Sequence, residues 1–287
     1  MTGEEKPLKG VLLVVAASFL FAVADALGKH LVMLYAAVLI LAVRYAANLV
    51  LVTLTMWPRH RSALWHTRRT GLVVLRGLCL TLSSVTFLAA LQAMPVAETV
   101  AIVYLTPVLV VLAAGPFLGE VVRPQGWIGA LLGFAGVLLI ARPGSGLETW
   151  GVALTLISAV LSAGYHLLTR ALMRSETTMA LMFHTALAGT VVFALMTAFL
   201  GIGTPPLTAD VGLMLALGAL TSLGHLCFTA AYREAPASTL APVNYMHVAF
   251  ATALGWLAFG QLPDAPGFAG MAAIAAAGLI AAWRPER

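Results

Sequence analysis

The chain has 287 residues, of which 61% are apolar and 9% are charged, and its mean hydropathy is +0.98. A soluble domain usually carries about 25% charged residues, so a soluble domain of this length is excluded, whereas a surface that faces lipid needs few charges. The net charge of +5 does not indicate a nucleic-acid partner, because the basic residues stand at the ends of apolar segments, as they do beside a bilayer.

Apolar segments recur along the whole chain. A helix needs about 20 apolar residues to cross the hydrocarbon of a bilayer. Ten segments meet or nearly meet this length, and we expect helices at residues 9–29, 33–56, 71–92, 97–118, 125–141, 149–172, 178–200, 209–232, 238–259 and 264–283. Most links are short, which makes neighbouring helices antiparallel. The longest polar link is expected between Pro58 and Thr70.

Basic residues lie mainly on one side of the expected membrane. If the N-terminus is placed on side one, that side carries 12 Lys and Arg residues and the other side carries 2, Lys29 and Arg142. The positive-inside rule therefore predicts that both termini are cytoplasmic. We expect a multi-pass protein of the plasma (inner) membrane of a bacterium.

A shift of 141 residues aligns the two halves of the chain without a gap. It matches Gly10 with Gly151, Pro95 with Pro236, Tyr104 with Tyr245, and Gly129 with Gly270. We therefore expect one repeat at residues 1–146 and a second at 147–287. Because five spans per repeat is an odd number, the second repeat enters the membrane in the opposite direction. The predicted fold is an all-α membrane protein of ten transmembrane helices in two inverted five-helix repeats, the usual architecture of alternating access.

Several short motifs of the first half resemble a known family. Residues 90–143 contain Pro95 in a turn, Thr106-Pro107 in the fourth span and Gly119-Glu120 at its cytoplasmic end, and Arg44-Tyr45 lie in the second span. These features resemble the EamA-type repeat of the drug/metabolite transporter superfamily, and the resemblance covers essentially the whole chain.

The second half departs from the family's pattern at two places. Gln261 stands where a glutamate is common, and His247-Val248 stand in place of Thr-Pro. Residue roles are therefore carried over to the second repeat less securely than to the first.

The resemblance implies a carrier for amino acids, nucleotide-sugar-like metabolites, purines or drugs. The chain most resembles the bacterial amino-acid exporters of this family, so we expect it to export small metabolites, amino acids first. The alternatives are an intramembrane enzyme, a passive pore, and a carrier of drugs or nucleotide-related metabolites. The sequence has no His-Glu-x-x-His motif and no filter loop or ring of like charges. We expect no enzyme, cofactor or metal.

Two charged residues within the spans are the first candidates for substrate binding. Arg44 lies near the middle of the second span, where a charge costs at least about 2.5–3.5 kcal/mol unless it faces the bundle interior. Arg44 is predicted to bind an anionic group bidentately, or to pair with Asp25 or with backbone carbonyls. Asp25, in the first span, is predicted to bind an ammonium, to carry a proton or to pair with Arg44. An i,i+4 pair with Lys29 is the alternative.

Other polar side chains also lie at depths where they need partners inside the bundle. Besides Arg44 and Asp25, we predict that a central cavity between helices 1–4 and 6–9 binds substrate through Ser84, Tyr104, Tyr165, His225, Asn244, Tyr245 and His247. The similar depth of His166, His184, His225 and His247 predicts either a titratable layer or four separately bonded histidines. Glu98 is expected to stabilise the start of the fourth span.

The fifth span carries a stripe of glycines that favours close packing. Gly126, Gly129, Gly133 and Gly136 share one helix face, and we expect helices five and ten to form a scaffold. The expected partners are a small-molecule substrate and membrane lipid, and we expect a monomer. Proton coupling and uniport both remain open from sequence.

Overall fold

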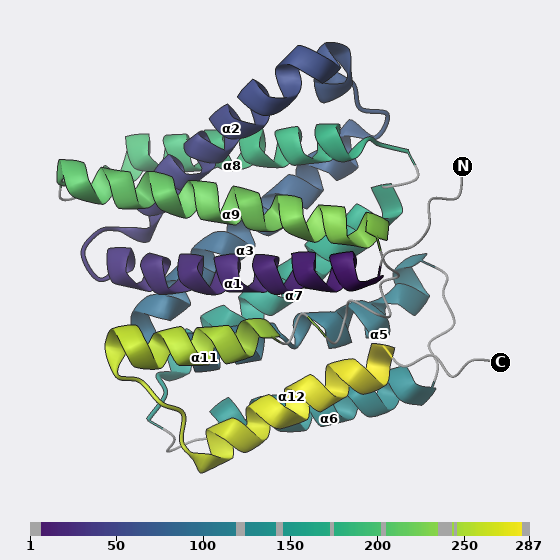
Figure 1. The fold of residues 1–287 in the computed structure, drawn as a ribbon, viewed down its shortest axis with the longest axis vertical. Coiled ribbons are helices and arrows are strands. Elements are labelled where there is room, and N and C mark those ends of the chain that lie inside the picture. Colours follow the sequence, from purple (N-terminus) through teal and green to yellow (C-terminus); the bar gives the residue numbers. More distant parts are fainter. Residues whose placement is uncertain are drawn as a thin grey trace.

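The computed structural model describes residues 7–118, 124–141, 146–172, 175–201, 205–234, 243 and 246–282. Within these ranges the regular structure is helical and contains no strand. The helices are α1 (Pro7–Val32), α2 (Ala37–Trp65), α3 (Thr70–Ala93), α4 (Val96–Val103), α5 (Thr106–Leu118), α6 (Pro124–Ala141), α7 (Thr149–Leu172), α8 (Thr178–Leu200), α9 (Thr208–Glu234), α11 (Met246–Phe259) and α12 (Ala265–Ala282) (Figure 1).

The predicted membrane spans agree with these helices. Within the described residues, six helices are long and apolar enough to cross a bilayer, namely α1, α2, α3, α7, α8 and α9. Shorter apolar stretches lie in α4 and α5, in α6, in α11 and in α12. The fold is therefore an all-helical membrane fold. The first half of the expected ninth span, 238–259, lies largely outside the described residues.

The fourth span was wrongly predicted as one continuous helix over 97–118. The structure divides it into α4 and α5, with a turn at Tyr104 and Leu105. The amide of Leu105 donates to the carbonyl of Ile102, three residues back, and that of Tyr104 to Val100 and Ala101. Pro107 follows, and a proline has no N–H with which to continue the i→i−4 ladder. The break therefore has a cause in the sequence.

The second helix extends further toward the C-terminus than the predicted span, 33–56. The helix α2 continues to Trp65, so the polar link expected from Pro58 to Thr70 shrinks to residues 66–69. Arginine, alanine and leucine, which have high helix propensity, occupy much of this extension. The basic stretch is therefore part of a helix and not a loop.

Two groups of helices form the body of the protein. In the first bundle, α1 packs on α9 and α11, and α2 packs on α9. In the second bundle, α3 packs on α7 and α8, and α4 and α5 pack on α7. The bundles meet where α2 lies on α8, α4 on α11, and α1 on α3. The helices α6 and α12 pack together at one end of the molecule (Figure 1).

This packing pattern repeats when the chain is shifted by 141 residues. The shift converts α1 into α7 and α3 into α9, so the contact between α1 and α9 becomes the contact between α7 and α3. It also converts the bounds of α6, 124–141, into 265–282, which are the bounds of α12. The two halves of the chain therefore pack in equivalent ways.

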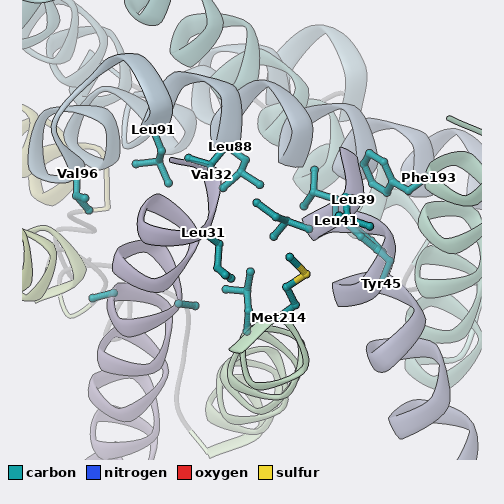
Figure 2. Packing of buried hydrophobic residues seen from close by; sticks show 14 of the residues in the cluster. Leu31, Val32, Leu39, Leu41, Tyr45, Leu88, Leu91, Val96, Phe193 and Met214 are labelled. Carbon is teal, nitrogen blue, oxygen red and sulfur yellow. The ribbon is translucent and has the colours of Figure 1, made fainter. Parts of the chain in front are cut away.

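The largest buried cluster lies on one face of the molecule. We call the face with the α1–α2, α3–α4 and α8–α9 links the distal face, and the opposite face, where α1 begins and α9 ends, the terminal face (Figure 1). Leu31, Leu39, Leu91, Val96 and Met214 come from five helix ends at the distal face and are packed together (Figure 2). We call this cluster, which joins both bundles, the distal seal.

A hydrogen bond fixes the α1–α2 link at the distal face. The Tyr35 hydroxyl donates to Oδ2 of Asp210, in the first turn of α9, at 2.6 Å, and accepts from the amide of Leu207 at 3.3 Å. The bond to the Asp210 carboxylate favours the neutral hydroxyl and raises the pKa of Tyr35 above its ordinary value of 10.0. The link is thus attached to its own bundle.

The contact between α6 and α12 is made by backbone against backbone. A Cβ atom added at Gly136 would lie 2.7 Å from the carbonyl oxygen of Gly270, and one added at Gly270 would lie 2.6 Å from that of Gly136. Neither atom can move away without shifting a helix. The expected scaffold of helices five and ten therefore depends on these two glycines.

We predict that the substitution Gly136→Ala will destabilise the protein by about 1–3 kcal/mol, the usual range for overpacking. Gly212→Ala is the matched control, because a Cβ atom there meets nothing within 4 Å. It should be neutral, or stabilising by up to about 1 kcal/mol, since alanine has the higher helix propensity. Unfolding of the purified proteins in detergent measures both changes. Equal stabilities would contradict the close approach of α6 and α12.

Candidate functional site

Three of the predicted site residues form one chain of hydrogen bonds. Nε2 of His247 lies 2.9 Å from Oδ2 of Asp25, and Nδ1 of His247 lies 3.2 Å from the Tyr104 hydroxyl. The side chains of His247 and Asp25 are 13% and 16% exposed. The imidazole thus joins a carboxylate to a phenol in a largely water-free setting.

Local helix structure places these three groups. Asp25 projects from the distal half of α1, seven residues before its end, and His247 is the second residue of α11. Tyr104 lies in the turn that divides α4 from α5. Interrupted helices are tolerated in membrane proteins where they line a cavity or are buried in protein. The break after α4 therefore brings the Tyr104 side chain to the site.

Aromatic contacts bring His225 to the same region. The Phe21 ring on α1 lies 5.0 Å from the His225 ring on α9 and 6.1 Å from the His247 ring, measured between centroids. Four of the nine predicted site residues, Asp25, Tyr104, His225 and His247, are therefore gathered around one part of α1. Asn244 and Tyr245 lie outside the described residues.

Arg44 has no charged partner within the described part of the chain. The side chain is half-buried on α2, and its guanidinium carbon lies 5.3 Å from the centroid of its neighbour, Tyr45. In the described region it makes no hydrogen bond or ion pair. The pairing of Arg44 with Asp25, one of the alternatives considered, does not occur, because Asp25 is bonded to His247.

Asp25 and Lys29 do not form the i,i+4 pair that was considered either. Lys29 is 5% exposed, and its ammonium donates to the carbonyl oxygens of Leu91 at 3.1 Å and Met94 at 2.6 Å. These carbonyls end α3, where the helix dipole favours a cation. Lys29 therefore joins the distal ends of the two bundles.

Arg76 was not among the predicted site residues, although it is a second arginine within a span. It is 4% exposed, and its guanidinium makes four hydrogen bonds, to Thr169, Leu181, Thr185 and Tyr165, at 2.6 to 3.0 Å. Its carbon also lies 4.3 Å from the Tyr165 ring centroid. The hydroxyl of Tyr165, a predicted binding residue, thus accepts a bond from Arg76.

The predicted site residue Ser84 is held by a bond between the bundles. Its hydroxyl lies 2.8 Å from the Tyr45 hydroxyl, and both side chains are buried. His184, one member of the histidine layer, places Nδ1 2.8 Å from the carbonyl oxygen of Ala180, on its own helix. His166 lies against Tyr165 instead. The four histidines therefore have different surroundings, and the Phe21 ring is a neighbour of both His225 and His247.

The site combines charges of both signs. The Asp25 carboxylate lies with His247, and the charges of Arg44 and Arg76 both act on His225. Arg76 is bonded on all sides, whereas Arg44 has no such bonds in the described region.

The sequence model of the family described as "EamA-like transporter family" matches the chain twice, over residues 8–142 and 149–283. Both bounds of the second match lie 141 residues after those of the first, which is the shift found in the sequence. The two matches cover nearly the whole chain.

Several relatives with named functions are similar over most of their length. A pseudopaline exporter of Pseudomonas aeruginosa (strain UCBPP-PA14) is 30% identical over 91% of each chain. A riboflavin transporter of Brucella anthropi is 30% identical over 82% of this chain and 84% of its own. An S-adenosylmethionine uptake transporter of Rickettsia bellii is 22% identical over 69% of this chain and 67% of its own. A solved crystal structure has a TM-score of 0.69 at 19% identity and 97% coverage of each chain, and it shares the fold.

The bond between Tyr45 and Ser84 predicts a measurable coupling. Removing one hydroxyl leaves the other without this buried partner, so Tyr45→Phe and Ser84→Ala should each destabilise the protein by about 1 kcal/mol. The double variant should lose less than the sum of the two, by about 0.5 kcal/mol or more. Unfolding in detergent measures the cycle. Additive losses would show that the two hydroxyls do not interact.

Proposed function

Because the chain belongs to the EamA-like transporter family, within the drug/metabolite transporter superfamily, we propose that it exports a small zwitterionic metabolite by alternating access, with amino acids and their derivatives as the first candidates. Its relatives are named as transporters of pseudopaline, riboflavin and S-adenosylmethionine, so the family name alone does not choose the substrate. The proposed substrate class is therefore argued from the charged residues of the site.

The observation that carries this proposal is the state of Arg44. A guanidinium in the middle of a span is costly unless a cavity or a partner receives it, and within the described residues Arg44 has neither a hydrogen bond nor an ion pair. A carboxylate of the substrate supplies the missing partner. Asp25 supplies the opposite charge for an ammonium, so an amino acid matches both.

The remaining predicted residues have supporting roles in this proposal. Tyr104, His225 and His247 surround Asp25, and with Asn244 and Tyr245 they complete the binding site. Ser84 and Tyr165 act through Tyr45 and Arg76, to which they are bonded. Two repeats, at residues 1–146 and 147–287, exchange equivalent conformations during the cycle.

The distribution of buried contacts supports alternating access. The distal seal joins helices of both bundles. On the terminal half, the described clusters are smaller: Val14 packs with Ala231 inside the first bundle, and Val73 with Leu172 and Leu181 inside the second. Another pair, Val52 and Phe183, joins α2 to α8, which meet between the bundles. This pattern is expected of a carrier closed at the distal face.

Charge places the distal face outside the cell. The excess of basic residues beside the termini favours the cytoplasm for the terminal face. In this proposal the protein lies in the inner membrane of a bacterium, and the packed distal face is its closed outer side. Lys29 is the polar latch of this closed outer side, because it bonds α1 of one bundle to the end of α3 in the other.

We predict that liposomes containing the protein will exchange at least one labelled amino acid or amino-acid derivative with saturation, and that Arg44→Lys will slow this exchange about 10–100-fold. Lysine keeps the charge but not the planar fork that binds a carboxylate, and a hydrogen bond to a charged group contributes about 1.5–3 kcal/mol. Riboflavin and S-adenosylmethionine complete the panel. Arg68→Lys, at an exposed link, is the matched control and should exchange at the normal rate.

Two results would reject this assignment. Normal exchange by Arg44→Lys would remove Arg44 from the substrate site. Exchange of riboflavin or S-adenosylmethionine, without any amino acid or derivative, would reject the substrate class while leaving a carrier.

We predict that Lys29→Met will shift the protein toward the outward-open state. A cysteine introduced as Met214→Cys, at a side chain 0% exposed in the distal seal, should react about fivefold faster with an impermeant maleimide when the latch is absent, a typical size for a coupling between sites. The background lacks Cys79 and Cys227. Lys9→Met is the matched control, because Lys9 pairs with Glu234 inside the first bundle. If both lysine variants label at the wild-type rate, Lys29 is not a latch.

A further inference from the structure

We propose that the pair of Asp25 and His247 is a proton-exchange site at which a proton and the ammonium of the substrate compete, which makes the protein a proton/substrate antiporter. This inference rests on the proposed carrier function. It adds the driving ion, its binding site and the direction of coupling. The substrate class remains a small molecule with an ammonium group.

The hydrogen bonds of His247 allow the site to gain or lose a proton without breaking. In the neutral ring, Nε2–H donates to the Asp25 carboxylate while Nδ1 accepts from the Tyr104 hydroxyl. In the imidazolium, Nδ1–H donates to the same hydroxyl oxygen, because a phenol both donates and accepts. Between the two states, only the O–H bond of Tyr104 has to rotate, so that it points toward Nδ1 of the neutral ring and away from Nδ1–H of the imidazolium. Both protonation states therefore fit the same geometry.

His247 lies where the two bundles meet. Its partner Asp25 belongs to α1 of the same bundle, whereas Tyr104 ends α4 of the other bundle. When the bundles move apart at the distal face, His247 keeps Asp25 but loses Tyr104 as the acceptor for its second N–H. Both protonation states lose this bond, but an unpaired N–H of the charged ring costs more free energy than an unpaired nitrogen of the neutral ring, so the imidazolium is stabilised more in the present outward-closed state than in the outward-open state. A proton that binds from outside consequently favours the return to the cytoplasm-facing state.

The helices packed against α11 bring few other ionisable groups. From α1 these are Asp25 and, one turn further, Lys29, whose ammonium is already bonded to Leu91 and Met94 at the distal end of α3. From the other bundle, α4 brings Tyr104 and the buried Glu98, in its first turn. On α9, His225 is the further titratable group and meets His247 across Phe21. Asp25 is therefore the carboxylate that is paired with His247.

The repeat shows that the fold alone does not require this pair. A shift of 141 residues converts Asp25 into His166, and it converts Thr106 into His247. The equivalent pair in the other bundle is therefore His166 and Thr106. Thr106 instead donates to the carbonyl oxygen of Ala159 at 3.2 Å. The carboxylate–imidazole pair is thus present at only one of the two equivalent positions. Since the fold forms without such a pair at the other position, we infer that the pair serves the function of the protein and not its folding.

The exchange balances in atoms and charge. In the cytoplasm-facing state, the ammonium of the substrate takes the place of the imidazolium beside the Asp25 carboxylate. His247 releases one proton to the cytoplasm and becomes neutral. Outside, the substrate leaves and His247 takes up one proton. Each cycle moves one proton inward for one substrate outward, and for a neutral zwitterion it also moves one positive charge inward.

A ligand-free measurement tests the proton site. The reporter is Met214→Cys in a background without Cys79 and Cys227, the two cysteines of the chain, labelled with an impermeant maleimide between about pH 8.5 and pH 5.5. Each rate is divided by that of Leu34→Cys, an exposed residue of the α1–α2 link, which corrects for thiol ionisation. Because protonation favours closure, the ratio should fall about fivefold on acidification.

Variants distinguish His247 from the other titratable groups. His247→Gln retains a donor for Asp25 but cannot bind the proton, so its ratio should be independent of pH. The matched control His184→Gln, whose ring bonds to the carbonyl oxygen of Ala180 on its own helix, should retain the wild-type dependence. A flat wild-type ratio, or an unchanged dependence in His247→Gln, would overturn the proposal. Size-exclusion chromatography verifies that each variant is folded.

A second measurement separates coupling from transport. The probe is the labelled compound of the panel above that the wild-type protein exchanges fastest. Exchange by His247→Gln between equal pH values is measured first as the baseline of that variant; relative to its own baseline, a pH gradient should drive accumulation by the wild-type protein but not by His247→Gln. Accumulation by His247→Gln at the wild-type level would overturn the proposal. If the wild-type protein exchanges no compound of the panel, the carrier proposal fails, whereas the labelling ratio still decides the proton site.

Discussion

Lipid offers no hydrogen bonds, so each polar group inside the hydrocarbon has to be paired by the protein itself. Arg76 makes four bonds to α7 and α8, Lys29 bonds to the end of α3, and Asp25 bonds to His247 on α11. Each of these bonds fixes which helices touch. In a protein whose apolar surfaces do not drive helices together within a bilayer, such bonds and close glycine contacts determine the two bundles.

Much of the fold could be predicted from the sequence, because hydropathy and the 141-residue shift are properties of the chain alone. The bounds of α6 and α12 obey the shift, and Gly136, at their contact, belongs to the predicted stripe. The break in the fourth span was missed because the segment is apolar enough overall to be taken for one continuous span. Pro107 was its one local signal.

The candidate site was predicted only in part, because a sequence shows depth in the membrane but not the direction of a side chain. Asp25, Tyr104 and His247 have suitable depth and also meet. Arg44 and Arg76 have similar signals in the sequence, yet one is half-buried without a bond in the described region and the other is fully bonded. The hydroxyl-bearing neighbours of Arg76 lie about 90 to 110 positions away along the chain, so no local pattern identifies them.

The distal seal also gives the carrier a thermal property. It consists of leucine, valine and methionine side chains that are packed away from water in this state. Opening them to water on the outside has a positive heat-capacity change, and hydrophobic association weakens on cooling. For the alternating access proposed above, the balance between the two orientations is therefore temperature-dependent and curved, like the stability of a soluble core. Within that proposal, cold favours the orientation in which the distal seal is open, so the rate-limiting step of the cycle can differ between a cold and a warm cell.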